Sequence, residues 1–141
     1  MRKTAFYLLS AVATLLLAAC TRNHGDIGIW FGTWHVQSIT ADGSPVPVEG
    51  DFFFQFQNRV FRVSKVSGHE DVVESYGTWS ESDDGHTMTI AFPDSSTYYI
   101  KMPGLEAHNA FTVTASTSRR VTLTKADTTG TTYCYHLIKQ N

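Results

Sequence analysis

The chain from residue 30 onward is a succession of short β-prone runs separated by residues that favour turns. The runs span 34–40, 52–57, 59–66, 72–80, 87–92, 97–101, 110–116, 120–125 and 132–139. Apolar residues recur at every second position in several of them, as in Phe52, Phe54 and Phe56, which is typical of a strand with one buried face. One short turn of helix is expected, at 105–109. About nine short strands at regular spacing predict an all-β sandwich or barrel.

The turns are short enough for hairpins. Asp42-Gly43 and Asp83-Asp84-Gly85 are strong turn signals, and Asn58 marks another tight connection. We expect Pro45 and Pro47 to keep their connection out of a β-ladder. Hairpin connections favour an up-and-down meander, and closing the meander removes edges that invite aggregation. The sequence therefore predicts a closed antiparallel up-and-down barrel of about 8–9 strands in preference to a sandwich.

Residues 1–19 have the features of a signal peptide. Arg2 and Lys3 form a basic start, and the uncharged stretch from Ala5 to Ala18 follows. That stretch is shorter than the roughly 20 residues that span a bilayer, and it fits a signal-peptide core. The alternative to a lipoprotein signal is an ordinary secretory signal followed by an incidental cysteine.

The end of this segment, Leu17-Ala18-Ala19-Cys20, resembles the bacterial lipobox. The resemblance implies cleavage before Cys20 and lipid on its thiol, and several acyl chains together anchor a protein stably to a membrane. Thr21 in the next position implies the outer membrane, on either face. Residues 20–29 would form a tether, with a single domain at 30–141. The part of that tether after Cys20 reaches at most about 30 Å.

Charge and cysteine content limit the partners further. The chain has 11 basic and 13 acidic residues, and losing Arg2 and Lys3 leaves 9 against 13, a net charge of -4. Such a surface does not attract nucleic acid by charge, so we expect no nucleic-acid partner. With Cys20 carrying lipid, Cys134 has no disulfide partner, and we expect it to pack as a small apolar side chain.

Motifs for catalysis and metal binding are missing from the sequence. It contains no His-Glu-x-x-His, Cys-x-x-Cys or Gly-x-Ser-x-Gly motif and no glycine-rich phosphate loop. His35 and His136 lie on the first and last runs and could meet across a closed barrel, but two ligands make a poor metal site. We therefore expect a protein that is not an enzyme and has neither a metal nor a cofactor.

Two Gly-x-Trp triplets, Gly32-Thr33-Trp34 and Gly77-Thr78-Trp79, begin or lie within β-prone runs. Together with the Asp42-Gly43 turn, the aromatic second run and the ending 121–139, they resemble the small lipocalin-like lipoproteins of Bacteroidetes. The resemblance extends over residues 30–140 and implies a lipocalin-like β-barrel. Glycine permits a close approach of neighbouring chain, and the two tryptophans are expected to point into the barrel.

Aromatic side chains are the candidate functional residues. Those expected to line one interior and contact a ligand there are Trp34, Phe54, Phe56, Trp79, Tyr98, Phe111 and Tyr135. A barrel of about eight strands either is filled by its own side chains or holds one small ligand. Two functions follow: a binding protein for a small apolar or amphipathic ligand, or a solid barrel that contacts an envelope protein partner as an interaction or inhibitor module. Arg62, Arg119 and Arg120 are either charged contacts for an acidic ligand or solvated rim groups.

Overall fold

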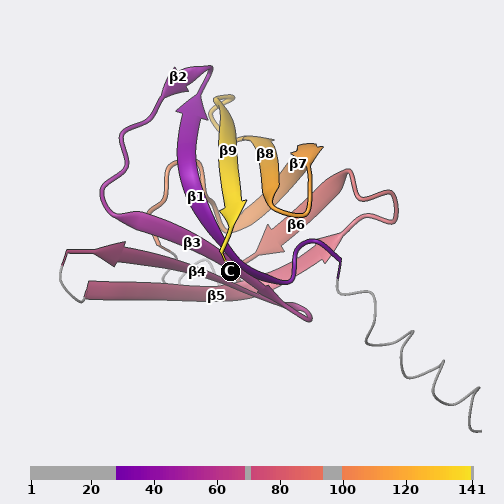
Figure 1. Ribbon diagram of the computed structural model, residues 1–141. Helices are drawn as coiled ribbons and strands as arrows, with labels where there is room; N and C mark the ends of the chain where they lie inside the picture. The colour runs from indigo at the N-terminus through magenta and orange to yellow at the C-terminus, as the bar shows by residue number, and fades with distance from the viewer. Residues whose placement is uncertain (1–27, 69–70, 94–99, 141) are drawn as a thin grey trace, which may run out of the picture.

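The computed structural model describes residues 28–68, 71–93 and 100–140, which form nine antiparallel strands (Figure 1). The strands are β1 (Gly32–Ala41), β2 (Ser44–Pro45), β3 (Asp51–Gln57), β4 (Val60–Ser67), β5 (Asp71–Glu81), β6 (Thr87–Ala91), β7 (His108–Ser116), β8 (Arg120–Ala126) and β9 (Thr132–Lys139). Each strand from β3 to β8 pairs with the next, β3 also pairs with β1, and β9 returns to pair with β1. Eight strands therefore close into a barrel, with β2 added beside the end of β1. The predicted closed up-and-down barrel is confirmed.

Closure depends on the long pairing between β1 and β9. Trp34 lies opposite Lys139 at one end of this pairing, and Ala41 lies opposite Tyr133 at the other. The register shifts by one residue between Val36 and Ser38. Such a bulge bends a strand and increases its twist, which a small closed barrel requires.

The barrel has two distinct ends. The lower end is where β1 starts and β9 finishes, and it carries the β3–β4, β5–β6 and β7–β8 turns. The upper end carries the turn at Asp42-Gly43, where both residues have positive φ, as expected for a tight hairpin. It also carries residues 100–107, which lead into β7 and which we call the upper strap. No helix in the described ranges is long and apolar enough to cross a lipid bilayer.

Alternating side chains build the core. Phe52, Phe54 and Phe56 of β3 all point inward with at most 2% of their surface exposed, while their neighbours on the strand point outward. Val121 and Leu123 of β8 do the same. The alternation read from the sequence thus predicts correctly which faces of these two strands are buried.

One prediction around the upper strap is wrong, and a second is tested only at its last two residues. The expected helix at 105–109 is absent, because residues 105–107 lie in no helix and β7 starts at His108. Of the expected strand at 97–101, residues 97–99 lie outside the described part, and Ile100 and Lys101 belong to no strand. Side-chain contacts to the barrel, given below, hold this segment in an irregular conformation.

Pro45 also departs from the prediction. It lies in the two-residue strand β2, opposite Thr40 of β1. A proline lacks a backbone N–H, but β2 is a short edge strand, the position in a sheet where proline is tolerated. Pro47 lies outside the ladder, as expected.

Candidate functional site

Aromatic rings fill the lower half of the barrel interior. Phe56 lies at their centre: its ring centroid is 5.4 Å from that of Trp30, 5.2 Å from Phe61, 5.2 Å from Trp79 and 6.5 Å from Phe54. These are the distances of rings in direct edge or tilted contact. The structure thus brings together Trp79, Phe54 and Phe56 from the predicted set, as neighbours that pack against one another.

Trp34 closes the lower end of the interior. It is fully buried, and its indole N–H donates a hydrogen bond to the carbonyl oxygen of Trp30 at 2.9 Å. The ammonium of Lys139 lies 5.3 Å from the Trp34 ring centroid, a cation–π distance, and donates to the carbonyl oxygen of Ile29 at 2.8 Å. The chain before β1 is thereby fixed beneath the barrel.

Trp30 is a core residue that the sequence reasoning missed. It is 1% exposed and its ring lies 6.1 Å from that of Trp34. Trp30 lies at the expected border between the tether and the domain, and for that reason it was not assigned to the core. The apolar group Ile29-Trp30-Phe31 before the first strand was a signal that could have identified it. Gly32 has a φ of +115°, a conformation that glycine adopts readily, and this lets the chain turn from Trp30 into β1.

The second Gly-x-Trp triplet is at a close approach of two strands. A Cβ on Gly77 of β5 would lie 2.4 Å from the carbonyl oxygen of Ala91 on β6, so a larger residue does not fit without movement. Trp79 points toward the interior but is only partly buried, and its indole N–H donates to the carbonyl oxygen of Gln57 at 3.2 Å. Both triplets therefore place a tryptophan against the lower core.

The upper strap packs over the upper half of the interior. Its side chains Ile100, Met102 and Leu105 are at most 5% exposed and belong to the core. The Tyr135 hydroxyl, inside the barrel on β9, donates to the carbonyl oxygen of Pro103 at 2.5 Å. Burial raises the pKa of Tyr135 well above its usual value, with a smaller contribution from nearby Tyr133.

Of the two remaining residues predicted to contact a ligand, one is buried and the other lies outside the described residues. Phe111 is fully buried, with its ring 5.7 Å from that of Tyr135 in an edge contact. Tyr98 lies outside the described residues, as does Cys20. The lipid anchor on Cys20 therefore stays a prediction.

A buried lysine joins the upper strap to the barrel. Lys125 of β8 is 4% exposed, and its ammonium donates to the carbonyl oxygen of Gly104, to Glu106 Oε1 at 3.1 Å and to Asn109 Oδ1 at 3.0 Å. An ammonium has three N–H donors, so these contacts use all of them. Lys125 thus has no donor left for a ligand. Its parity with the buried Leu123 was the sequence signal that it points inward.

Asn109 completes this polar cluster. Its amide nitrogen donates to the carbonyl oxygens of Glu106 at 2.7 Å and Ile90 at 3.2 Å, and its Oδ1 also accepts the backbone N–H of Glu106 at 2.8 Å. Buried polar groups contribute to stability when they are satisfied in this way. The cluster therefore holds the upper strap in place.

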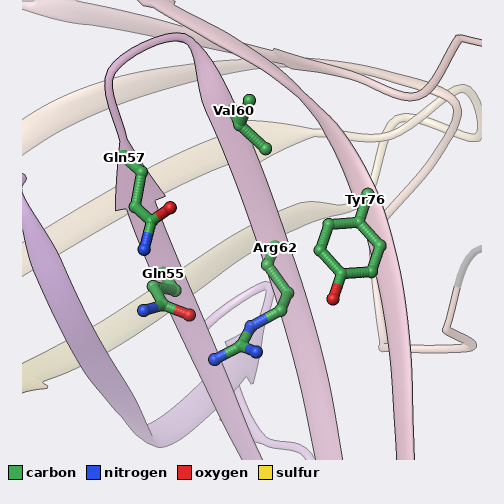
Figure 2. A pocket seen from close by; sticks show the side chains of 5 residues that line it. All are labelled: Gln55, Gln57, Val60, Arg62 and Tyr76. Atoms are coloured by element: carbon green, nitrogen blue, oxygen red, sulfur yellow. The ribbon is translucent and has the colours of Figure 1, made fainter.

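A shallow hollow lies on the outer face of β3, β4 and β5. It has a volume of about 230 Å³ and is lined by Gln55, Gln57, Val60, Arg62 and Tyr76. Figure 2 shows two glutamines on one strand, Val60 and Arg62 on the next and Tyr76 on the third, all around this hollow. We call these five residues the outer hollow. Two other hollows, of about 310 and 550 Å³, lie where β1, β8 and β9 meet and at the lower end beside Trp30.

Two of the residues that line the outer hollow are exposed apolar side chains. In the described ranges, four of the five large apolar side chains that are exposed lie on β4 and β5: Val60, Val72, Val73 and Tyr76. Val60 is 49% and Tyr76 55% exposed. Of these four, only Val60 and Tyr76 line the outer hollow, because Val72 and Val73 lie toward the other end of β5, opposite Val66 and Lys65.

Glu74 links two side chains of the outer hollow. Its Oε1 lies 3.2 Å from Arg62 Nη1, and its Oε2 accepts the Tyr76 hydroxyl at 2.9 Å. The Arg62 Nε is buried and has no hydrogen-bond partner. Arg62 is therefore a half-buried, ion-paired group on the outer face, while Arg119 and Arg120 lie exposed at the β7–β8 turn. The three arginines do not form one site.

The two strand histidines do not meet. Although β1 and β9 pair as expected, His35 lies opposite Ile138, and His136 lies opposite Ser38. His35 instead contacts Asp51 at 3.1 Å. No group of three or more His, Cys, Asp or Glu side chains within 28–68, 71–93 and 100–140 is placed to hold a metal ion.

Cys134 differs from the expectation of a packed apolar residue. It is only partly buried, on the parity opposite to the buried Tyr135. Its sulfur lies 3.8 Å from His136 Nε2 and 3.9 Å from the Thr124 hydroxyl. The thiol thus has polar neighbours on the outer surface of the barrel.

Comparison with known proteins places the fold. No family model matches the sequence, and no curated protein matches it at a significant level. A lipocalin-like protein from Bacteroides uniformis superimposes with a TM-score of 0.62 at 19% identity, covering 80% of this chain and 100% of the other. An uncharacterized protein from Bacteroides eggerthii gives 0.62 at 20% identity, covering 79% and 99%. Bovine odorant-binding protein gives 0.46 at 13% identity, covering 82% and 74%. The similarity to the Bacteroides uniformis protein shows that the chain has a lipocalin-like fold.

Proposed function

We propose that this protein is a lipid-anchored binding module of the cell envelope that acts through the outer face of a solid barrel and has no enzymatic activity. The observation that carries the proposal is the mutual contact of the interior rings, with Phe56 in contact with four others. Barrels of about eight strands are small enough for side chains to fill them. Two exposed apolar side chains, Val60 and Tyr76, line the outer hollow instead.

The polar groups of the interior support the same function. A ligand held in a barrel needs a few side chains with unused hydrogen-bonding capacity to orient it. The Lys125 ammonium, the buried charge best placed for that role, is saturated by three acceptors. The Tyr135 hydroxyl is likewise bound to Pro103. Both side chains hold the upper strap.

A second candidate is a carrier of a small apolar or amphipathic molecule in the upper half of the barrel. The observation in its favour is that Met102 and Ile100 fill this half from the upper strap and not from a strand. Movement of the strap would let an apolar ligand take their place. The lipocalin-like fold is compatible with this function, but a fold alone does not establish what is bound.

Native mass spectrometry of the protein extracted in mild detergent from the cells that make it separates the two candidates. The solid-barrel function predicts the mass of the protein alone with its lipid. Lys125→Met should loosen the strap and serves as the comparison, because only this variant should take up an added fatty acid. A small molecule that copurifies stoichiometrically with the unaltered protein would favour the carrier and contradict the solid barrel.

The lipid anchor has its own experiment. Cys20→Ser removes the thiol that the lipobox resemblance implies is lipidated, so the protein should move from the membrane fraction to the soluble fraction. Cys134→Ser is the matched control, since Cys134 lies within β9, and it should stay with the membrane. Labelling with a radioactive fatty acid should mark the control and not Cys20→Ser. Unchanged membrane fractionation of Cys20→Ser would show that the anchor is wrong.

A further inference from the structure

We propose that the outer hollow binds a neutral saccharide unit. This inference rests on the proposed function, in which the outer face is the working surface, and it names the class of ligand. The groups that line the hollow are two primary amides, a guanidinium that is already ion-paired, a phenol ring and one valine. Their arrangement, charge balance and orientation each favour this chemistry.

Strand register brings these side chains together. Gln55 of β3 lies opposite Arg62 of β4, which in turn lies opposite Tyr76 of β5. Gln57 lies opposite Val60 in the next outward-facing row. All five side chains come from paired strands of a closed barrel, and sites built on such elements hold their geometry better than sites on loops. Figure 2 shows the amide groups and the guanidinium on one side of the hollow and the Tyr76 ring on the other.

The charge balance of the outer hollow favours a neutral ligand. The positive charge of Arg62 is compensated by Glu74 at 3.2 Å, and the two glutamines carry no charge. An anion would meet the Glu74 carboxylate beside the guanidinium, and a cation would compete with Arg62. Neither ion gains a clear Coulomb attraction here.

The hydrogen-bonding groups suit hydroxyl-rich ligands. Each glutamine amide has both donors and an acceptor, while the guanidinium supplies donors in a fixed plane. Sugar hydroxyls donate and accept, so they can bond to both kinds of group. The ring of Tyr76, 55% exposed, offers a flat apolar surface to the C–H face of a pyranose. A saccharide is the class of ligand that uses the amides, the guanidinium and the ring together.

Glu74 orients the site before a ligand arrives. One of its oxygens binds Arg62 and the other accepts the Tyr76 hydroxyl at 2.9 Å, so one carboxylate fixes both the guanidinium and the ring. Such preorganisation lowers the entropy lost on binding. Glu74 is thus a positioning residue for both the guanidinium and the ring.

A protein partner fits these features less well. A standard protein interface covers about 800 Å² on each side, and its buried centre is depleted of charged residues. The centre of this surface is an ion pair between Arg62 and Glu74, and its concave part is only about 230 Å³. The hollow has the size for a small polar unit, which can be a terminal or internal residue of a longer glycan.

Surface plasmon resonance tests the proposal with the lipidated protein captured in nanodiscs. The probes are soluble neutral oligosaccharides of glucose, mannose, galactose and N-acetylglucosamine. At least one of these should bind reversibly, and Tyr76→Ala should weaken its binding by about tenfold or more, as for an aromatic anchor. Val72→Ala is the control on the same strand, since Val72 is exposed but lies outside the hollow. It should bind as the unaltered protein does.

Two further variants separate stacking from positioning. Tyr76→Phe keeps the ring and loses the bond to Glu74, so it should retain most of the affinity that Tyr76→Ala loses. Glu74→Ala frees both Arg62 and Tyr76 without removing a proposed ligand contact. It should weaken saccharide binding by a smaller factor than Tyr76→Ala does. Circular dichroism melts of all variants should agree within a few degrees, because these residues lie outside the core.

Each outcome bears on the proposal. Absence of binding to every neutral probe would overturn it, and so would binding that Tyr76→Ala leaves unchanged. Binding confined to sulfated or uronic oligosaccharides, added as a second panel, would contradict the neutral ligand. Photo-crosslinking of an envelope protein through position 76 without saccharide binding would favour a protein partner instead. These results leave the solid barrel standing, since that proposal is tested separately, by the search for a ligand in the interior and by the packing of the interior rings.

Discussion

Replacement of Phe56 by alanine measures how fully the barrel interior is packed. Its side chain is completely buried and contacts four aromatic rings at centroid distances of 5.2–6.5 Å. Phe56→Ala removes the ring from a strand whose backbone is paired on both sides, with β1 and with β4. The surrounding rings therefore cannot collapse far into the space that is left.

The expected loss of stability follows from two contributions. Withdrawing a buried phenyl group forfeits about 2 kcal/mol of transfer free energy, and the unfilled cavity costs about 2 kcal/mol more at roughly 24 cal/mol per Å³. A loss of about 3–5 kcal/mol in the free energy of unfolding is expected, the usual range for buried phenylalanine. For a domain of this size, it corresponds to a melting temperature lower by roughly 10–25 °C.

Urea denaturation followed by circular dichroism gives the free energy of unfolding, with Phe53→Ala as the matched control. Phe53 lies three residues earlier on the same strand, faces outward and is only partly buried, with its ring 5.1 Å from His35. Its removal should cost about 1 kcal/mol or less, as is usual away from the core. Both variants lose a phenyl group, which points into the core at position 56 and away from it at position 53.

Small aromatic solutes provide a second measurement on Phe56→Ala. A dry cavity lined by apolar groups binds benzene, so saturating benzene should restore part of the lost stability in this variant and leave Phe53→Ala unchanged. A cost for Phe56→Ala no larger than that for Phe53→Ala would refute the packed interior. Stabilisation of the unaltered protein by benzene would do the same, because it would reveal space that is already present.

Three other changes test the structural features around this core. Lys125→Met should lower the free energy of unfolding, measured by urea denaturation, by about 2–4 kcal/mol, because it leaves buried hydrogen-bond acceptors without a donor. The double variant with Glu106→Gln should lose less than the sum of the two separate losses. Gly77→Ala should lower the melting temperature by at least about 8 °C, since its new methyl group would meet the Ala91 carbonyl oxygen at 2.4 Å. Burial raises the pKa of Tyr135 in the folded state, so its contribution to stability is complete below about pH 10 and is lost as the pH rises further. Tyr135→Phe should therefore show a smaller decline in unfolding free energy above pH 10 than the unaltered protein.

Strand positions and the closed fold could be predicted because their signals are local. The last run was expected at 132–139, and β9 spans Thr132–Lys139. Inward and outward faces followed from alternation, as for Phe54 and Leu123, both fully buried. The positive φ at Asp42 and Asn58 agrees with the turn chemistry read at those positions. A structural feature that depends only on residues close in sequence can be predicted from the sequence alone.

The upper strap was misassigned because tertiary contacts determine its conformation. No periodic pattern runs through residues 100–107, and their path depends on Lys125, about twenty residues further on, and on Tyr135, further still. The helix expected at 105–109 gives way to bonds between Asn109 and the backbone of Glu106. Long-range polar contacts of this kind override weak local propensity.

The candidate site was predictable in part. The aromatic residues named from the sequence lie in the interior wherever they are described, but their spacing decides whether a ligand fits, and spacing is a property of packing. The outer hollow left no comparable signal, because Gln55, Arg62 and Tyr76 are separated by seven and fourteen residues. Only the registers of two successive hairpins bring them into one row.

In a filled barrel, one set of residues determines the stability of the fold and another set binds the ligand. In a carrier, the residues that line the cavity also form the core, so substitutions there change affinity and stability together. Here the core rings lie on one parity of β3 and β4, and the outer hollow lies on the other. Side chains of opposite parity point to opposite faces of a sheet. Phe56→Ala should therefore change stability with little effect on saccharide affinity in the folded protein, and Tyr76→Ala should do the reverse. A strong correlation between the two properties across such variants would place the binding site in the interior after all.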